Sequence, residues 1–155
     1  MNLWDFLSGE LKILVISSLP IIELRGAIPY AISRGMNPLH AALLCIGGSM
    51  IPVPFLLFFL KPFFASLRNI LMIEKFEKWL IKRVERKARN IKKYSIFGLV
   101  LFVAIPLPST GVWTGSVAAA LFNLRIKHAF FAILMGNTIA ASIITFLSYF
   151  AARNM

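Results

Sequence analysis

Long apolar segments separated by short polar or basic stretches dominate the sequence. Two of them are long enough to cross a membrane: residues 39–60 form a run of 22 without a formal charge, and residues 128–150 form a run of 23. A helix of 22 residues is about 33 Å long, close to the ~30 Å hydrocarbon core of a bilayer. We therefore predict a transmembrane helix over each segment.

A third apolar segment does not fit a simple span. Residues 94–124 hold 31 residues without a charge, which is too long for one span and too short for two. The motif IPLPSTGVWTG lies in its middle, and its prolines and glycines end any helix there. We predict a re-entrant hairpin over residues 95–122, in which one half-helix enters the membrane, the chain turns at residues 106–111, and a second half-helix returns.

Residues 11–35 fit the same hairpin plan. The first half-helix is predicted over residues 13–22 and the turn over residues 23–28. The return helix is predicted to begin at Pro29, because proline suits the first helical position. Gly35 suits its end, because glycine readily adopts the left-handed conformation that terminates many helices.

The two hairpin-and-span units resemble each other. LPIIELRGAIPYAISRGMN aligns with IPLPSTGVWTGSVAAALFN at a constant offset of 86 residues, which pairs Pro20 with Pro106 and Asn37 with Asn123. After an insertion of two residues, HAALLCIGGSMI aligns with HAFFAILMGNTI. Identities are few, so the repeat rests on the shared order of hairpin, short loop and span. Repeats of this kind are typical of transporters.

A basic segment, residues 63–94, joins the first repeat, residues 1–62, to the second, residues 95–155. Apolar side chains recur at helical spacing over residues 72–91, and nine of the 17 basic residues fall within residues 74–93. This pattern predicts an amphipathic helix on the inner leaflet or, alternatively, a helix packed on a partner subunit.

Composition and charge favour a membrane protein. The chain is 59% hydrophobic and only 15% charged, which is too apolar for the surface of a soluble domain of 155 residues. If the repeats are inverted, 13 of the 17 basic residues lie on the cytoplasmic side, whereas a plain four-span topology puts the RIK loop outside. The positive-inside rule therefore favours inverted hairpins with the basic linker in the cytoplasm. Because the basic residues cluster beside apolar segments, we expect no nucleic-acid partner.

Glu23 and Arg25 are the leading candidates for a functional site. Ionisable groups in membrane segments are costly and usually mark function. Gly26 and Pro29 complete the motif, and a hairpin tip can line a wet or protein-walled cavity. Helix N-termini beside Arg25 favour an anion, and a low dielectric favours the protonated form of Glu23, which suits a proton carrier. The alternative is a structural ion pair that locks the tip.

The second hairpin and the last span offer uncharged candidates. Ser109 and Thr110 carry hydroxyls, Gly111 allows close backbone approach, and Trp113 offers a ring for stacking or for lipid. The alternative is that these residues only form the turn. Asn137 either binds substrate or ties helices together. The sequence reveals neither a nucleophile–base pair nor ligand spacing for a metal, so we expect no enzyme, cofactor or metal.

The motifs PIIELRGAIPYAI and PLPSTGVWTG resemble the paired motifs of the small multidrug export proteins of bacteria and archaea, which are related to the DedA/VTT membrane proteins. The resemblance covers nearly the whole chain and implies two facing re-entrant hairpins, inverted repeats and transport. In DedA relatives the role is proton-linked recycling of lipid-carrier phosphates, or lipid scrambling in eukaryotic cousins. The family's acid, Arg, Gly and Pro correspond to Glu23, Arg25, Gly26 and Pro29. DedA proteins also place arginines around the second hairpin, and PLPSTGVWTG has none, which weakens the case for a phosphate-lipid substrate.

The sequence thus predicts an all-α integral membrane transporter, with proton coupling as one option, that moves an amphipathic or anionic substrate through a site between the hairpin tips. Two alternatives stay open. One is small multidrug efflux, and the other is a non-transporting assembly or lipid-organising role. Membrane lipids are expected neighbours, and a homodimer is compatible with the small size and large apolar surface.

Overall fold

The computed structural model describes residues 9–68, 88–106 and 110–153, and every regular element in these ranges is an α-helix. The all-helical prediction is confirmed for this part of the chain. In order the helices are α2 (Gly9–Ser18), α3 (Glu23–Ser33), α4 (Pro38–Met50), α5 (Pro52–Arg68), α7 (Ala88–Ala104), α8 (Val112–Leu121) and α9 (Ile126–Arg153). The predicted linker over residues 63–94 lies mostly outside the described residues.

Two stretches of helix are long and apolar enough to cross a membrane: Pro38–Phe64, formed by α4 and most of α5, and Ile126–Arg153, which is α9. Both predicted spans fall within them. The first begins with Asn37 as N-cap, whose side chain accepts the amide of Leu39 at 3.0 Å. It bends at Ile51, because the proline that follows lacks the N–H that would continue the helical hydrogen bonds.

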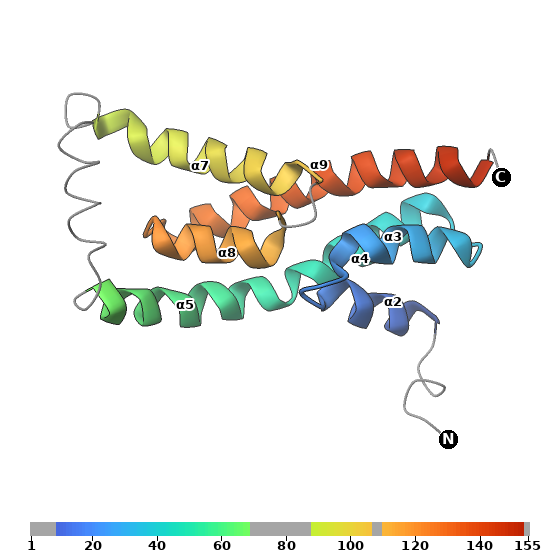
Figure 1. Cartoon of the computed structure of the whole chain (residues 1–155), viewed down its shortest axis with the longest axis horizontal. Coiled ribbons are helices and arrows are strands. Elements are labelled where there is room, and N and C mark those ends of the chain that lie inside the picture. Colours follow the sequence, from blue (N-terminus) through green and yellow to red (C-terminus); the bar gives the residue numbers. More distant parts are fainter. Residues whose placement is uncertain (1–8, 69–87, 107–109, 154–155) are drawn as a thin grey trace, which may run out of the picture.

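Four shorter apolar helices complete the fold. α2 and α3 have 10 and 11 residues and α8 has 10, so each is about 15 Å long, half the hydrocarbon thickness of a bilayer. The apolar part of α7, Ser95–Ala104, has the same length. Figure 1 shows α2 and α3 at one end of the molecule and α7 and α8 at the other, while α4–α5 and α9 run in opposite directions.

The first helix pair turns earlier than predicted. We predicted a turn over residues 23–28 and a helix beginning at Pro29, but α3 begins at Glu23 and contains Pro29. The reversal occurs at residues 19–22, and Glu23 completes it with a left-handed φ of 51°. The prediction was wrong because a proline on the exposed side of a helix looks the same in sequence as a proline at its start. In the second pair, the break between Ala104 and Val112 lies where the motif predicted it.

The second helices of the two pairs end in the same way. Gly35 and Asn123 follow α3 and α8 with left-handed φ values of 81° and 50°. Around each, two backbone hydrogen bonds form the Schellman pattern that such a residue permits. Donor and acceptor are Gly35 to Ile32 and Met36 to Ala31 after α3, and Asn123 to Ala120 and Leu124 to Ala119 after α8. Every residue of the second set lies 88 positions after its counterpart, and the predicted role of Gly35 is confirmed.

Two glycines mark matching helix crossings. A Cβ added at Gly48 in α4 would lie 2.7 Å from the carbonyl oxygen of Leu14 in α2. A Cβ added at Gly136 in α9 would lie 2.6 Å from the carbonyl oxygen of Val100 in α7. Each long helix therefore touches the first helix of its own half backbone to backbone, as small residues allow in membrane proteins.

These crossings correct the predicted alignment. The glycines are 88 residues apart but the carbonyls they approach are 86 apart, so an alignment of the two halves fits α2 and α7 at an offset of 86 and α4 and α9 at an offset of 88. The two extra residues lie in the connection between α7 and α8, not after Asn123. Asn37 is the N-cap of α4, whereas Asn123 is the left-handed residue after α8, so the predicted pairing of these two residues is wrong.

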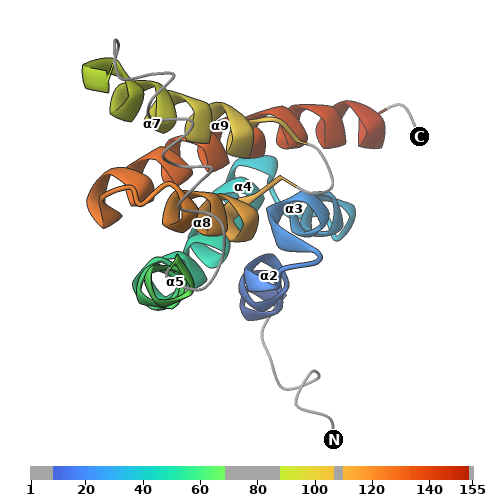
Figure 2. The same cartoon turned by 60° about the vertical axis from the view of Figure 1, so that its left-hand side comes forward.

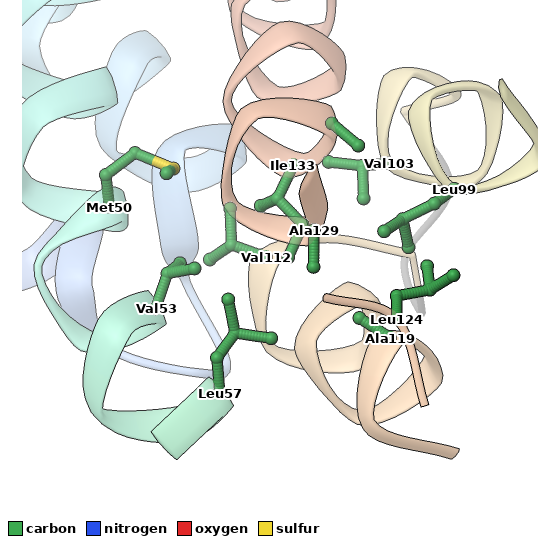
Figure 3. Packing of buried hydrophobic residues seen from close by; sticks show 11 residues of the cluster. Met50, Val53, Leu57, Leu99, Val103, Val112, Ala119, Leu124, Ala129 and Ile133 are labelled. Atoms are coloured by element: carbon green, nitrogen blue, oxygen red, sulfur yellow. The ribbon is translucent and has the colours of Figure 1, made fainter. Parts of the chain in front are cut away.

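The core lies where the short helices meet the long ones. One cluster, shown in part in Figure 3, joins α4, α5, α7, α8 and α9 through Met50, Val53, Leu57, Leu99, Val103, Val112, Ala119, Leu124, Ala129, Ala132 and Ile133. A second cluster joins α2, α3, α4 and α9. The outer surface is also apolar, with exposed phenylalanines at 55, 58, 59, 63, 131, 146 and 150. Soluble monomers rarely expose apolar surface on this scale, so the exterior and the two long helices suggest a membrane protein.

Candidate functional site

The candidate site lies where the start of α3 meets the second helix pair. Figure 2 shows the starts of α3 and α8 next to each other in the middle of the molecule. Glu23 and Arg25, in the first turn of α3, both contact residues between the end of α7 and the first turn of α8. The structure thus brings the two predicted motifs into direct contact.

The carboxylate of Glu23 binds the N-terminus of α8. Glu23 is 7% exposed, and its Oε1 accepts the amide of Val112 at 2.6 Å. The amide of Trp113 is a second donor to the same side chain. The first amides of a helix have no partner within the helix and form its positive end, so an anionic group is well placed here. Gly111 lies directly against the carboxylate, and a Cβ at this position would overlap it.

The guanidinium of Arg25 binds the C-terminal end of α7. Its Nη2 donates to the carbonyl oxygen of Ile105 at 3.2 Å and to the hydroxyl of Thr110 at 3.0 Å. Its Nε lies 3.8 Å from Oε2 of Glu23. Side chains two apart in a regular helix point in different directions, but the left-handed conformation of Glu23 brings this pair together. Each charge therefore faces the helix end of opposite polarity.

Trp113 links the same junction to the first pair. Its ring is half-buried, and its Nε1 donates to the carbonyl oxygen of Ser18, the last residue of α2, at 3.2 Å. We predicted this ring for stacking or for lipid contact, and the structure gives its polar edge a partner within the protein.

The other predicted site residues are placed differently. Gly26 lies beside the tip against the side chain of Ile22, and Pro29 is exposed further along α3. Ser109 lies outside the described residues. Asn137 is 1% exposed, and its Nδ2 donates to the hydroxyl of Ser49 at 2.8 Å, which ties α9 to α4. This contact fits the helix-tying alternative.

Several partners in this region were not predicted. The amide of Val112 and the carbonyls of Ser18 and Ile105 are backbone groups, which every residue carries, so no residue type could have indicated them. Ser49 could have been found, because the alignment of HAALLCIGGSMI with HAFFAILMGNTI places it opposite Asn137.

The arrangement can hold one proton or one anion. Glu23 is the only carboxylate that the described structure places at the junction, beside one guanidinium, one hydroxyl and two amide donors. Among the described residues, no three His, Cys, Asp or Glu side chains gather as metal ligands would. An apolar groove lies apart from the junction, between α3 and α9, and is lined by Pro29, Ile32, Ser33, Leu147, Ser148, Ala151 and Ala152.

Comparisons with known proteins give one family. Neither the curated proteins nor the solved structures contain a match. The model of the family described as "Putative small multi-drug export protein" matches residues 23–143, well over half of the chain. The match begins at Glu23 and includes α3, α8 and all the contacts between them described above. The chain therefore belongs to the small multi-drug export protein family.

Proposed function

We propose that the protein is a transporter of the prokaryotic inner membrane in which α2–α3 and α7–α8 are two re-entrant hairpins that enter from opposite sides. The lengths of the short helices support this, because each reaches only halfway across a bilayer. The basic linker is then cytoplasmic, in keeping with the positive-inside rule. The family's name as export proteins supports a transport role.

The two halves are proposed to be inverted repeats. The matching Schellman ends and the matching glycine crossings support this relation. The strongest support comes from Ser49 and Asn137, which occupy matched positions 88 residues apart and bind each other. A two-fold axis brings a residue near it into contact with its own counterpart, as in the interface of a symmetric dimer.

The observation that carries the function is the buried carboxylate of Glu23 on the N-terminus of α8. Protonation removes its negative charge and weakens its bonds to the amides of α8 and its attraction to Arg25. A single proton therefore loosens the contact between the two hairpins, and this couples protonation to a change of shape. The same proton leaves these amides and Arg25 free to hold an anion, so a proton and an anionic substrate would bind together.

The proposed substrate is an amphipathic anion such as a lipid-carrier phosphate, the substrate class of the DedA relatives that the motifs resemble. The guanidinium of Arg25 and the start of α8 suit a phosphate. The second candidate is an apolar drug, which the family's name favours. For such a substrate Glu23 acts as a proton carrier and Arg25 holds the tip.

A flux assay with matched variants tests the proposal. Purified protein in liposomes under a pH gradient is given farnesyl phosphate or tetraphenylphosphonium as probes. The wild type is expected to move one of them, and Glu23→Gln is expected to move neither while it unfolds at a similar temperature in detergent. Glu10→Gln is the control, because the Glu10 side chain is 59% exposed and distant in sequence from the tip motif.

Two results would contradict it. If the wild type moves neither probe, or if Glu23→Gln moves its probe at the wild-type rate, the proposed site is wrong. If Glu23→Gln mainly lowers the unfolding temperature and loses flux only in proportion, Glu23 is a structural lock.

Topology can be tested independently. Cys45 is replaced, single cysteines are placed at positions 34 and 122 after the two short return helices, and intact cells are treated with an impermeant thiol reagent. Inverted hairpins predict that position 34 labels from outside and position 122 only after lysis. A plain four-span bundle predicts labelling of both positions from one side.

A further inference from the structure

Two side chains at matched positions bridge the hairpins in opposite directions. Arg25 in α3 and Trp113 in α8 are 88 residues apart, the offset that relates these two helices. Arg25 donates to the carbonyl of Ile105, just after α7, and Trp113 donates to the carbonyl of Ser18, at the end of α2, each at 3.2 Å. Each return helix thus binds the C-terminal end of the other hairpin's first helix.

The acceptors explain why these contacts matter. The last carbonyls of a helix lack a partner within the helix and form its negative end. The carbonyl of Ile105 also accepts the hydroxyl of Thr110 at 2.6 Å, and this hydroxyl accepts a bond from Arg25, so Arg25 holds the carbonyl both directly and through Thr110. In a membrane no bulk water replaces a lost donor, so loss of a bond to either carbonyl is costly. Each of the two bonds therefore closes its own side of the junction, the Trp113 bond at the end of α2 and the Arg25 bond just after α7, and only full separation of the tips breaks both.

Because Glu23 is buried in the junction, the junction must open before a proton or substrate can reach it. Glu23 is only 7% exposed, and Gly111 lies directly against its carboxylate. A side chain this buried exchanges with water or substrate only when the contacts around it loosen, and these two bonds belong to the same junction.

We propose that Arg25 and Trp113 form a reciprocal latch that keeps the two hairpin tips closed over Glu23 and opens when the site exchanges with either side of the membrane. This inference rests on the proposed transport function and assigns the conformational control of its site. Trp113 acts in it as a positioning residue and not as a stacking platform for substrate. The Arg25 half is the stronger one, because its bond is charge-assisted and that of Trp113 is neutral.

Two matched reporters distinguish the two halves of the latch. Ser18 and Ala104 end α2 and α7. Ser18 itself carries the carbonyl that Trp113 binds, and Ala104 directly precedes Ile105, whose carbonyl Arg25 binds. After replacement of Cys45, Ser18→Cys and Ala104→Cys are labelled with a small methanethiosulfonate reagent in liposomes. Each rate is compared with that of the same reporter in an otherwise wild-type background.

A crossed pattern is expected. Trp113→Phe keeps an aromatic ring without the N–H, so labelling at position 18 should rise about fivefold to tenfold, the factor for losing a hydrogen bond of ordinary strength. Position 104 should change less than about twofold. Arg25→Gln should raise labelling at position 104 by at least the same factor and leave position 18 nearly unchanged, whereas Arg25→Lys, which keeps the charge, should have a smaller effect.

Tyr30→Phe serves as the control. It removes the phenol that accepts a bond from Arg34 at 3.2 Å, at the opposite end of α3 from the tip, and should alter neither reporter. If Trp113→Phe leaves position 18 at the wild-type rate, or raises both reporters equally, the latch is wrong. The Arg25 variants decide the question separately if Trp113→Phe does not fold. Labelling does not depend on transport, so a failed latch is distinguishable from a failed transport proposal, which the flux of Glu23→Gln decides.

Discussion

The two short helix pairs end their second helices in the same way but differ in chemistry where their helices turn back, which we call the two tips. Where the first tip has Glu23, the matched position of the second, 88 residues later, is Gly111, and the two lie in direct contact. Where the first has Arg25, the second has Trp113. A second carboxylate at position 111 would overlap and repel the first. If the halves are inverted repeats as proposed, one carboxylate near their axis serves both, and the space that it fills explains the glycine at the matched position.

Moving the carboxylate from one tip to the other tests this comparison and has the largest expected effect. Gly111→Glu alone crowds and charges the junction, and we expect it to lower the free energy of unfolding by about 3–5 kcal/mol, as an unpaired buried charge does. Glu23→Gly together with Gly111→Glu vacates the space, and the extended backbone at Gly111 (φ −178°) accepts any residue. The double variant should recover about half of that loss.

Thermal unfolding in detergent measures all three variants, with Glu23→Gly alone as the reference. A double variant less stable than Gly111→Glu would show that the two positions are not interchangeable, and the internal axis would lose its main chemical support.

The close helix crossings at Gly48 and Gly136 allow the packing of the two halves to be compared. A Cβ at Gly48 or Gly136 would lie within 2.7 Å of a backbone carbonyl oxygen, which cannot move like a side chain. We expect Gly48→Ala and Gly136→Ala each to cost about 1–3 kcal/mol, as overpacking does. Gly47→Ala is the control, because nothing lies within 4 Å of its added Cβ and alanine favours a helix. A tolerated Gly136→Ala beside a damaging Gly48→Ala would break the match between the halves.

Asn137 and Ser49 form a contact between matched positions, and we expect its removal to lower stability by an intermediate amount. Helix-tying predicts that Asn137→Ala and Ser49→Ala each lower stability and that a double-mutant cycle gives a coupling of about 0.6–1.7 kcal/mol, the range for hydrogen bonds between membrane helices. Unfolding temperatures of the four proteins measure it. Additive effects, with flux lost in Asn137→Ala at unchanged stability, would instead indicate a role in substrate binding.

The sequence predicted what depends on side-chain type. Uncharged runs located both long helices, and IPLPSTGVWTG located the break between α7 and α8. The features that the sequence analysis misplaced are those that depend on backbone conformation. Nothing in ELRGAIPYAI shows that Glu23 adopts a left-handed φ and begins α3, so the turn was predicted over residues 23–28 instead of 19–22.

The partners of Glu23 and Arg25 show the same difference between what side-chain types predict and what only the fold determines. Glu23 and Arg25 stood out because charges are rare in apolar segments, but they bind an amide and a carbonyl at the ends of α8 and α7. Any residue offers these groups, so only the fold determines which of them meet the charges. The alignment of the predicted repeats is a further case, because few identities supported it and the choice between offsets of 86 and 88 depended on hydrogen bonds and close approaches.

The smallest effect is expected where the two halves already use different residues for one purpose. Gly35 and Asn123 both hold the left-handed position after a return helix, and glycine and asparagine are the residues that tolerate it best. Gly35→Asn should therefore change stability by less than about 0.5 kcal/mol, whereas Gly35→Ala should cost about 1 kcal/mol, because a left-handed alanine is strained. Asn123→Gly should be neutral and Asn123→Ala costly to a similar degree. Equal responses at the two sites, measured by unfolding in detergent, would extend the match to the ends of the hairpins. If only Gly35 responded, the match would be confined to the tips and the helix crossings.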